Sequence, residues 1–404
     1  MPLLVIYNPV CGDRSAKPFF QEHVLPLLTD KGKNVDLTVE TTHEGHAGQV
    51  VSEFLHGTTS EEPLSVVIGS GDGTVNEVVN ELFKDRSGSA TVRRIHIALV
   101  PCGTANALYS SLFPVPSGEA AAKDVDYRLQ SVRAFVSGER KRVPLSLAAT
   151  ELKSPASSEG GTDTVTKTIV SVVVTSTSLH AAILHSSEAL RAEHPGLERF
   201  KIAAQQNSTK WFKARVRLLP TLRNNTAPEI YDSGSKSFVP ASVEGGIVEL
   251  QGPFAYFLST INVDRLEPTF RITPLSHSIP PPPNTCDIVV IRPLRDPTLS
   301  EDDAAAREQF VAKTWAAMMA AYQEGAHVDL RYDEKGAIAP GGQGENLIEY
   351  YRCGGWEWHP DPSDEDARLV CSDGAINVIE PNGWAECRAS TSSEDRPTFE
   401  IYVA

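Results

Sequence analysis

The sequence predicts an α/β N-terminal domain with a doubly wound, mostly parallel sheet, followed by a C-terminal antiparallel β-sandwich domain. In the first 115 residues, short apolar runs without polar alternation are separated by helix-length amphipathic segments, which is typical of parallel strands covered on both faces. From residue 131 onward, alternating runs and turn-rich connections are typical of antiparallel sheets. We therefore expect one domain over residues 1–130 and a second over residues 131–404, whose last strands can return to the cleft.

Each element of the first domain follows from its own local pattern. The runs LLVIY and LSVVIGS are continuously apolar, as buried strands are, whereas Val75, Val78, Val79 and Leu82 recur at helical spacing. The expected strands cover residues 3–7, 35–40, 64–70 and 95–100. The expected helices cover residues 16–29, 46–55, 74–83 and 105–112, and an Ala-rich, charged helix at 118–130 leads out of the domain.

The second domain is predicted from shorter and more varied patterns. The expected strands include RAFVS (133–137), TIVSVVVTS (168–176), FAYFLSTINV (254–263) and a strand pair at 350–360. One clear helix is expected at 302–323, opened by Ser300 with Asp303 three residues later. Residues 209–219 and 314–322 are predicted to be helices that line the core or the cleft. The polar stretches 153–165 and 223–245 are expected to be poorly ordered, and the prolines of 279–283 to form an extended surface connector.

Composition and charge exclude several classes of function. The net charge of −15 and the lack of any Lys- or Arg-rich block argue against a nucleic-acid partner. The six cysteines form no CxxC pair, which argues against a zinc module and favours free thiols. No apolar run approaches the roughly eighteen residues that span a bilayer, and the opening lacks a basic region before its short apolar run. We therefore expect a cytoplasmic protein, and the sequence does not predict its oligomeric state.

Three glycine-containing turns follow three of the expected strands. They are the segments NPVCG (8–12), GSGDGT (69–74) and PCGTAN (101–106), and each is expected to join a strand to a helix. A glycine lets backbone N–H groups approach an anion, and the following helix begins with unpaired N–H groups and a partial positive charge. Three such turns at one edge of a sheet would form a polyphosphate pocket. The chain lacks GxxxxGK[ST], and it lacks GxGxxG after the first strand, so it is neither a P-loop protein nor a typical dinucleotide-binding domain.

Asp72 stands between two glycines of the second turn. A carboxylate there would repel a phosphate unless it holds Mg²⁺ or accepts a proton from an attacking hydroxyl. The structural alternative is a turn aspartate that caps the helix at Thr74. The presence of the other two turns favours the functional interpretation.

The three turns also carry a specific resemblance. GSGDGTVNEVVNEL, VPCGTANALYSSL and YNPVCG resemble, in order and spacing, the motifs of the diacylglycerol kinase catalytic family, and Ser70 makes the second motif similar to that of sphingosine kinases. The resemblance implies an ATP- and Mg²⁺-dependent lipid kinase that phosphorylates a sphingoid base, a diacylglycerol or a ceramide-like lipid and associates transiently with a membrane surface. It also implies a nucleotide domain followed by a β-sandwich, with the lipid entering near their cleft.

The resemblance assigns roles to residues of this chain. Asp72 would be the general base, and Asp72 and Asp373 would hold Mg²⁺. Arg191 and Arg199, in a segment similar to one that contacts phosphate in sphingosine kinases, would meet the transferred phosphoryl group; the alternative is that both are solvated surface arginines. The nucleotide would contact Asn8, Gly12, Thr41, Ser70, Gly71, Gly73, Thr74, Gly103, Thr104, Arg191, Arg199 and Asp373. Glu77 and Asn106 would support these residues from behind, whereas His46 is better explained as a residue at a helix start.

The chain departs from the family pattern at three places. Ala182 and Leu184 stand about where sphingosine kinases carry a carboxylate for the lipid's ammonium, which favours a neutral acceptor. Ala375 replaces the glutamate of a D-G-E element, and Val10 replaces a residue that is often basic or polar. Two other functions stay open. One is a relative that binds nucleotide or lipid without transferring phosphate, and the other is an enzyme of the NAD kinase or 6-phosphofructokinase type.

Overall fold

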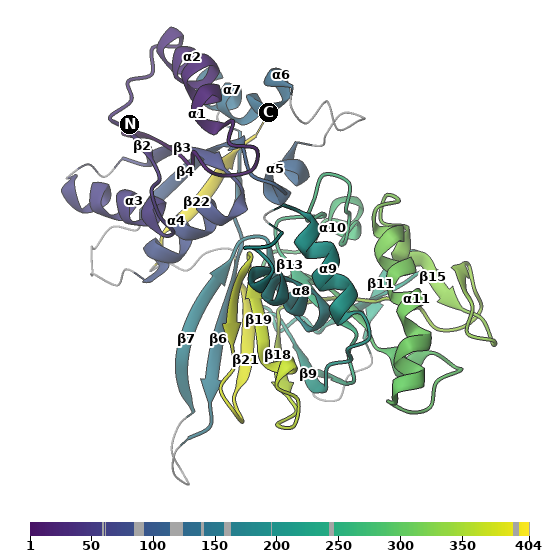
Figure 1. Cartoon of the computed structure of the whole chain (residues 1–404). Helices are drawn as coiled ribbons and strands as arrows, with labels where there is room; N and C mark the ends of the chain where they lie inside the picture. The colour runs from purple at the N-terminus through teal and green to yellow at the C-terminus, as the bar shows by residue number, and fades with distance from the viewer. Residues whose placement is uncertain are drawn as a thin grey trace. The chain divides into compact units, whose positions relative to one another are not determined.

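The computed structural model describes residues 1–58, 60, 62–84, 93–113, 124–138, 141–156, 163–194, 196–241, 246–390 and 396–403. The chain forms two compact units (Figure 1). The N-terminal unit comprises Met1–Leu147, Arg265–Pro268 and Thr391–Ala404, and the C-terminal unit comprises Ala148–Asp264 and Thr269–Ser390. We expected the first domain to end at residue 130; the observed unit continues to Leu147 and includes the end of the chain.

The sheet of the N-terminal unit has six strands in the order β2-β1-β3-β4-β22-β5. The first four strands of this sheet are parallel to one another. In chain order they are β1 (Leu3–Tyr7), β2 (Leu37–Glu40), β3 (Leu64–Ser70) and β4 (Arg94–Pro101). The C-terminal strand β22 (Thr398–Tyr402) pairs in parallel with β4, and β5 (Arg142–Pro144) pairs antiparallel with β22. Every residue of β1 and β3 is buried, as their continuous apolar runs predict for strands covered on both faces. The predicted doubly wound, parallel-dominated sheet is confirmed.

The helices of this unit follow the expected alternation with the strands. A continuous helical stretch comprises α1 (Ala16–Phe19), a π-helical turn (Phe20–Val24) and α2 (Leu25–Asp30). The others are α3 (His46–Gly57), α4 (Asp72–Lys84), α5 (Ala107–Leu112), α6 (Val125–Arg128) and α7 (Gln130–Ser137). On one face of the sheet, Phe20 and Leu28 pack in a single core with Val132 and Phe135 of α7. This core holds α1, α2 and α7 against one face of the sheet.

The prediction of a strand at RAFVS (133–137) is wrong, because these residues belong to α7. Leu129, Val132 and Phe135 lie three residues apart and all enter the core, which is a helical spacing rather than a strand alternation. Gly138 ends the helix in a left-handed conformation with a φ of 79°. Of the expected helix at 118–130, residues 118–123 lie outside the described residues, and the remainder forms α6 and the start of α7.

The C-terminal unit contains an eight-stranded and a six-stranded sheet with antiparallel pairings. The eight-stranded sheet runs β11 (Ser237–Pro240), β10 (Glu229–Asp232), β17 (Glu349–Cys353), β14 (Cys286–Ile291), β13 (Tyr256–Thr260), β8 (Val174–Thr177), β19 (Leu369–Ser372) and β20 (Ala375–Val378). The six-stranded sheet runs β12 (Val248–Gln251), β9 (Ala214–Leu219), β18 (Gly355–Pro360), β21 (Trp384–Ser390), β6 (Leu147–Ser154) and β7 (Thr164–Ser171).

The two sheets share an aromatic core. Phe257 of β13 lies 5.2 Å from Trp356 and 5.4 Å from Trp358 of β18, measured between ring centroids. Because β13 and β18 belong to different sheets, these contacts show that the inner faces pack on each other. The remaining elements of the unit are α8 (Ser178–Ala189), α9 (Glu198–Asn207), α10 (Leu275–Ser278), α11 (Ala304–Ala321) and the hairpin of β15 (Leu330–Tyr332) with β16 (Ile338–Pro340).

Several local predictions for this unit need correction. Residues 214–219 form strand β9 instead of a helix, because alternate residues of ARVRLL face the sandwich core. The stretch 223–245 is not unstructured throughout, since it contains the β10–β11 hairpin. Helix α11 is capped by Asp303, whose carboxylate accepts a hydrogen bond from the Ala306 N–H, and not by Ser300. The segment 350–360 contributes one strand to each sheet, so its two strands do not pair with each other.

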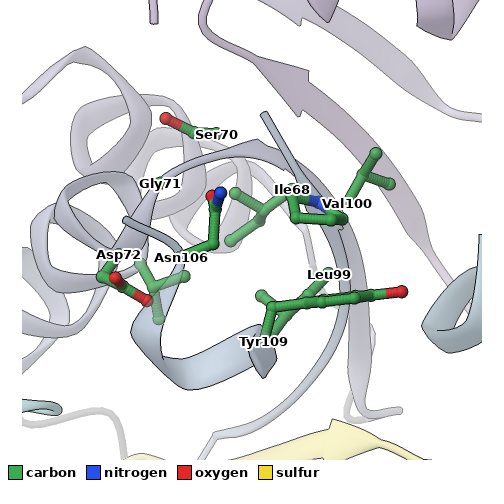
Figure 2. A pocket seen from close by; sticks show the side chains of 10 residues that line it. Ile68, Ser70, Gly71, Asp72, Leu99, Val100, Asn106 and Tyr109 are labelled. Atoms are coloured by element: carbon green, nitrogen blue, oxygen red, sulfur yellow. The ribbon is translucent and has the colours of Figure 1, made fainter. Parts of the chain in front are cut away.

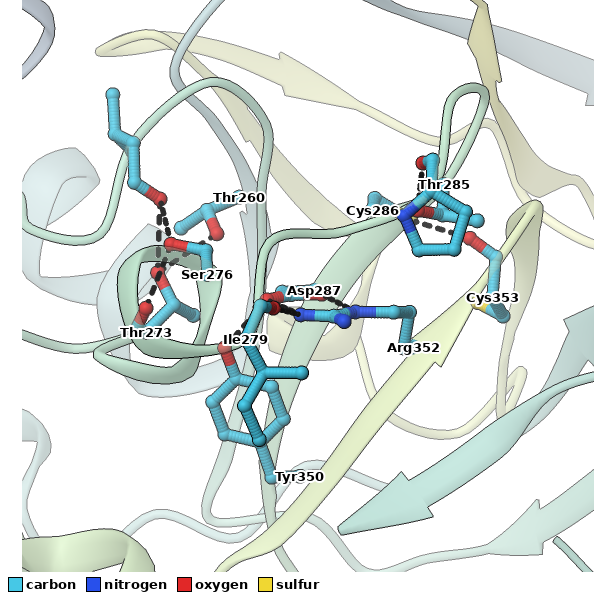
Figure 3. Close-up of polar contacts among 12 residues, drawn as sticks. Thr260, Thr273, Ser276, Ile279, Thr285, Cys286, Asp287, Tyr350, Arg352 and Cys353 are labelled. Carbon is cyan, nitrogen blue, oxygen red and sulfur yellow. Dashed lines mark hydrogen bonds and ion pairs between the residues drawn. The ribbon is translucent and has the colours of Figure 1, made fainter. Parts of the chain in front are cut away.

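A buried ion pair joins two neighbouring strands of the eight-stranded sheet (Figure 3). Arg352 of β17 donates two hydrogen bonds to Asp287 of β14, at 2.7 and 3.0 Å, and a third to the carbonyl oxygen of Ile279. The Tyr350 hydroxyl donates to the same carboxylate at 2.6 Å. Asp287 and Arg352 are only 2% and 3% exposed, so each requires the other to remain charged in the interior.

Within the described parts of the chain, no helix combines the length and the apolar character needed to cross a bilayer.

Candidate functional site

The structure brings the three glycine-containing turns together at the carboxyl edge of the N-terminal sheet. The Asn8 N–H donates to the Gly69 carbonyl at 2.9 Å, which joins the first turn to the end of β3. The Cys102 N–H donates to the Ser70 carbonyl at 3.1 Å, which joins the third turn to the second. The Cys11 thiol contacts the Cys102 carbonyl oxygen at 3.2 Å and closes the set. Parallel strands in this order place all their carboxyl ends at one edge, where ligands of such sheets bind.

Two of the glycines are required by this close approach. A Cβ atom on Gly103 would lie 2.3 Å from the Gly71 Cα, and a Cβ atom on Gly12 would lie 2.3 Å from the Cys102 carbonyl oxygen. Gly12 also has a φ of +51°, which favours glycine. Gly73 is different, because a Cβ atom there would meet nothing within 4 Å and its φ is not positive. The fold itself therefore does not explain why residue 73 is a glycine.

The Asp72 carboxylate is held by the backbone of the third turn's helix. One oxygen accepts from the Ala107 N–H at 2.8 Å and the other from the Leu108 N–H at 3.0 Å, so Asp72 bridges the start of α4 to the start of α5. Burial raises the pKa of Asp72 above its ordinary value, while these two N–H groups oppose that shift. Asp72 therefore caps a helix, as the structural interpretation expected, but that helix is α5 and not α4, to which Asp72 belongs. A partly exposed, fixed carboxylate of raised pKa is also suited to accept a proton.

Several predicted residues shape the turns from within. The Asn106 side chain accepts from the Gly103 N–H at 2.9 Å and donates to the Gly103 carbonyl at 2.8 Å, so it closes the third turn. The Thr74 hydroxyl donates to the Ser70 hydroxyl at 2.7 Å, and both residues are buried. The Glu77 carboxylate interacts with backbone N–H groups near the start of α3.

Other predicted contact residues lie at the same edge of the sheet. The Thr41 N–H donates to the Tyr7 carbonyl at 2.9 Å, directly before Asn8, and Thr41 is buried. The Asn8 side chain accepts from the Val10 N–H and stabilises the first turn. Thr104 is exposed. His46 begins α3, and its Nδ1 atom accepts from the Thr42 N–H, which agrees with its interpretation as a helix-start residue.

A pocket opens beside the second and third turns (Figure 2). Its polar lining comes from Ser70, Asp72 and Asn106, and it is a small, partly open pocket. Its apolar wall consists of Ile68, Val75, Leu99, Val100 and Tyr109. We did not predict this wall. Tyr109 follows Asn106 by three residues on the next helix, which is the signal that could have identified it.

Arg191, Arg199 and Asp373 belong to the C-terminal unit, and their part in the site stays a prediction. Arg191 is exposed and forms an ion pair with Glu188 at 2.6 Å. The Arg199 guanidinium lies 4.6 Å from the ring centroid of Phe200. The Asp373 carboxylate accepts three backbone N–H groups, from Val172, Val173 and Val174, at 2.6–3.0 Å.

The described residues contain no group of three or more His, Cys, Asp or Glu side chains that could hold a metal ion by themselves. Mg²⁺ often binds through one or two carboxylates, with phosphate and water oxygens completing its shell. Each Asp72 oxygen accepts one backbone N–H and keeps a further lone pair, so Asp72 fits such an ion. The three hydrogen bonds to Asp373 leave it less capacity for this role.

The segment that departs from the sphingosine kinase pattern forms α8. Ala182 and Leu184 are apolar and offer no carboxylate at these positions. Ala182 is buried and Leu184 is partly buried. The His180 Nδ1 atom lies 2.6 Å from the Ser176 hydroxyl oxygen, and burial lowers the pKa of His180 to about 4. His180 is therefore neutral near pH 7.

The N-terminal unit is thus an α/β domain in which three glycine-containing turns meet around a carboxylate, as expected for a phosphate-binding domain. Residues 2–136 match the family model for the diacylglycerol kinase catalytic domain. This part of the chain is therefore similar to that catalytic domain.

Several curated proteins that are similar to this chain are lipid kinases. The chain is 33% identical over 106 residues to sphingosine kinase 2 of Homo sapiens, which covers 26% of this chain and 15% of that protein. It is 36% identical over 111 residues to sphingosine kinase 1 of Arabidopsis thaliana, covering 27% and 21%. It is 31% identical over 143 residues to the mitochondrial acylglycerol kinase of Homo sapiens, covering 35% and 30%. The matched region spans less than a third of the length of these relatives.

A solved structure extends the similarity of fold to the whole chain. The crystal structure of a "putative diacylglycerol kinase" from Bacillus anthracis str. Sterne aligns with a TM-score of 0.51 at 15% sequence identity, covering 99% of this chain and 95% of that one. This likeness shows that the two-part architecture, an α/β unit followed by antiparallel sheets, is shared.

Proposed function

We propose that this protein is a lipid kinase that transfers the γ-phosphate of ATP to a lipid hydroxyl. The observation that carries the proposal is the contact of three glycine-containing turns beside Asp72, whose carboxylate is fixed by two backbone N–H groups of α5. Residues 2–136 match the diacylglycerol kinase catalytic domain, and the relatives named above are lipid kinases. Both facts support a lipid as the phosphate acceptor.

The proposed reaction uses Asp72 as general base. Asp72 takes the proton of the lipid hydroxyl while the hydroxyl oxygen forms a bond to the γ-phosphorus and the bond from that phosphorus to the ADP oxygen breaks. The turn N–H groups hold the phosphates, and Gly73 leaves the space that a phosphate requires. Mg²⁺ held by Asp72 and the phosphate oxygens would supply charge neutralisation. Arg191, Arg199 and Asp373 are proposed to complete the site from the C-terminal unit.

The acceptor is proposed to have a neutral head group. Ala182 and Leu184 offer no negative charge to an ammonium, and His180 is neutral near pH 7. A diacylglycerol, an acylglycerol or a ceramide-like lipid therefore fits better than a sphingoid base. Since such acceptors reside in bilayers, we also propose a cytoplasmic protein that associates transiently with a membrane surface.

A transfer assay tests this function. Purified protein is incubated with labelled ATP, Mg²⁺ and vesicles that contain, in turn, diacylglycerol, acylglycerol, ceramide or sphingosine. We expect a labelled lipid product from the wild type and a rate lower by about 10²–10⁴-fold for Asp72→Ala, since a general base contributes that much. Asp303→Ala is the matched control, because Asp303 caps α11 through the Ala306 N–H without lining the pocket. Equal rates for wild type and Asp72→Ala would remove Asp72 from the mechanism.

A second candidate is a protein that binds nucleotide or lipid without transferring phosphate. Two observations favour it: exposed Ala375 stands where the family glutamate is expected, and Asp373 is engaged by three backbone N–H groups. In the same assay this candidate predicts nucleotide binding with no labelled lipid. Adding NAD and fructose 6-phosphate as soluble acceptors tests the remaining alternative, an enzyme of the NAD kinase or 6-phosphofructokinase type.

A further inference from the structure

Arg128, the last residue of α6, carries a buried charge beside the third turn. Its residue exposure is 8%, and one Nη atom donates to the Cys102 thiol at 3.1 Å and reaches the Ser15 hydroxyl at 3.5 Å. Its guanidinium carbon lies 3.7 Å from the ring centroid of Phe19. These contacts place Arg128 beside Cys102 of the third turn.

All of these partners of Arg128 are neutral. Burial raises the pKa of Cys102, so its thiol does not ionise near pH 7 and does not balance the charge. Among the described residues, no ion pair joins a carboxylate to Arg128 within 4.0 Å, and the Arg128 Nε atom is buried without an acceptor. The Asp13 carboxylate lies near enough to act electrostatically on the same Cys102 thiol. A buried guanidinium that loses water without a direct anionic contact is destabilising. The free protein therefore holds Arg128 ready to accept an anionic ligand.

The position of this charge indicates which anion it meets. Cys102 belongs to the third turn, and Cys11 of the first turn contacts the Cys102 carbonyl oxygen at 3.2 Å. Ser15 immediately precedes α1, which follows the first turn. Arg128 thus contacts the third turn and the segment that follows the first.

We propose that Arg128 is a phosphate-binding residue of the nucleotide site, whose guanidinium donates to a phosphate oxygen held between the first and third turns. The inference rests on the proposed nucleotide-dependent function and adds a residue that none of the three turns contains. A bound phosphate would supply the direct anionic contact that the Arg128 guanidinium lacks in the free protein.

The test compares Arg128→Met, which removes the charge but keeps most of the chain length, with Arg128→Lys, which keeps a charge without the planar fork. Arg133→Met is the control, because Arg133 is an exposed arginine of α7 that pairs with Asp126. Affinities for ATP, inorganic pyrophosphate and adenosine are measured by calorimetric titration at several salt concentrations. The thermal unfolding midpoint of each free protein is recorded alongside.

We expect Arg128→Met to weaken ATP and pyrophosphate binding by about tenfold or more, to leave adenosine binding unchanged and to reduce the salt dependence. Its free form should unfold at the same or a higher temperature than the wild type, since a buried charge without a direct ion pair is gone. Arg128→Lys should bind with intermediate affinity, and Arg133→Met should match the wild type.

The opposite pattern overturns the proposal. If Arg128→Met binds ATP and pyrophosphate like the wild type, or if it only lowers the unfolding temperature, Arg128 is a structural tie and the kinase proposal stands. Should Arg128→Met fail to fold, the neutral variant Arg128→Gln takes its place, and an undiminished pyrophosphate affinity of that variant likewise excludes Arg128 from phosphate binding. If the wild type binds neither ATP nor pyrophosphate, this inference and the proposed function fail together.

Discussion

Gly73 allows the phosphate-binding interpretation to be separated from any effect on folding. It is the second residue of α4, it is exposed, its φ is not positive, and a Cβ atom there would meet no atom within 4 Å. The substitution Gly73→Ala therefore adds a methyl group to open space in a conformation that alanine prefers. Such replacements stabilise a protein by about 0.4–1 kcal/mol, which shifts the ratio of folded to unfolded protein by about twofold to fivefold.

The expected effect on nucleotide binding has the opposite sign. If a phosphate approaches the backbone at Gly73, the methyl group pushes it away and removes about one charge-assisted hydrogen bond. That bond contributes about 1.5–3 kcal/mol, so the affinity for ATP should fall by about tenfold to a hundredfold. Stability and binding are measured on the same samples, by urea unfolding and by titration with a non-hydrolysable ATP analogue.

Gly57 provides the matched control for this experiment. It is the last residue of α3, with no positive φ and nothing within 4 Å of a Cβ atom, so Gly57→Ala should stabilise the fold similarly. Its affinity for the analogue should equal that of the wild type. An unchanged affinity in Gly73→Ala would refute the argument that a phosphate occupies the space beside this glycine.

Two further predictions concern ionised groups. Because the folded-state pKa of Asp72 is raised, kcat/KM of the proposed transfer should begin to fall, as the pH is lowered, at a pH above the usual aspartate value near 4; a pH–rate profile checks this. Ionisation of Asp72 should lower the free energy of unfolding as the pH rises through its folded-state pKa, which urea unfolding at several pH values checks. Asp287→Ala leaves buried Arg352 without its carboxylate and should reduce the free energy of unfolding by about 3–5 kcal/mol. Asp366→Ala, which breaks an exposed pair with Lys210, should cost at most about 1 kcal/mol, and equal losses in the two variants would contradict the argument.

Much of the N-terminal unit could be predicted because its signals are local. Buried parallel strands such as β1 and β3 are continuously apolar, and the helix that begins at Asp72 shows a regular helical spacing. The glycine turns could also be recognised, since each follows a strand directly. Only the register of β1, β3 and β4 brings these turns into contact.

Predictions for the C-terminal unit were less accurate because short segments carry ambiguous patterns. ARVRLL has enough apolar residues for either a helix or a strand, and its pairing with β12 and β18 makes it β9. RAFVS, in the N-terminal unit, was also mistaken for a strand, because the helical spacing of Leu129, Val132 and Phe135 begins before these five residues. Tertiary contacts outweigh local preferences in such segments.

The sequence by itself determined the order of strands and helices in the first 115 residues, the three turns and the candidate carboxylate Asp72, because these features depend on neighbouring residues along the chain. The tertiary structure alone decided that Asp72 caps α5, that Gly103 touches Gly71, and that Arg128 lies buried beside the third turn. These contacts join residues more than 25 positions apart, as the separation of 26 between Arg128 and Cys102 illustrates. Such pairings depend on how the strands are ordered in the sheet, which no local pattern encodes.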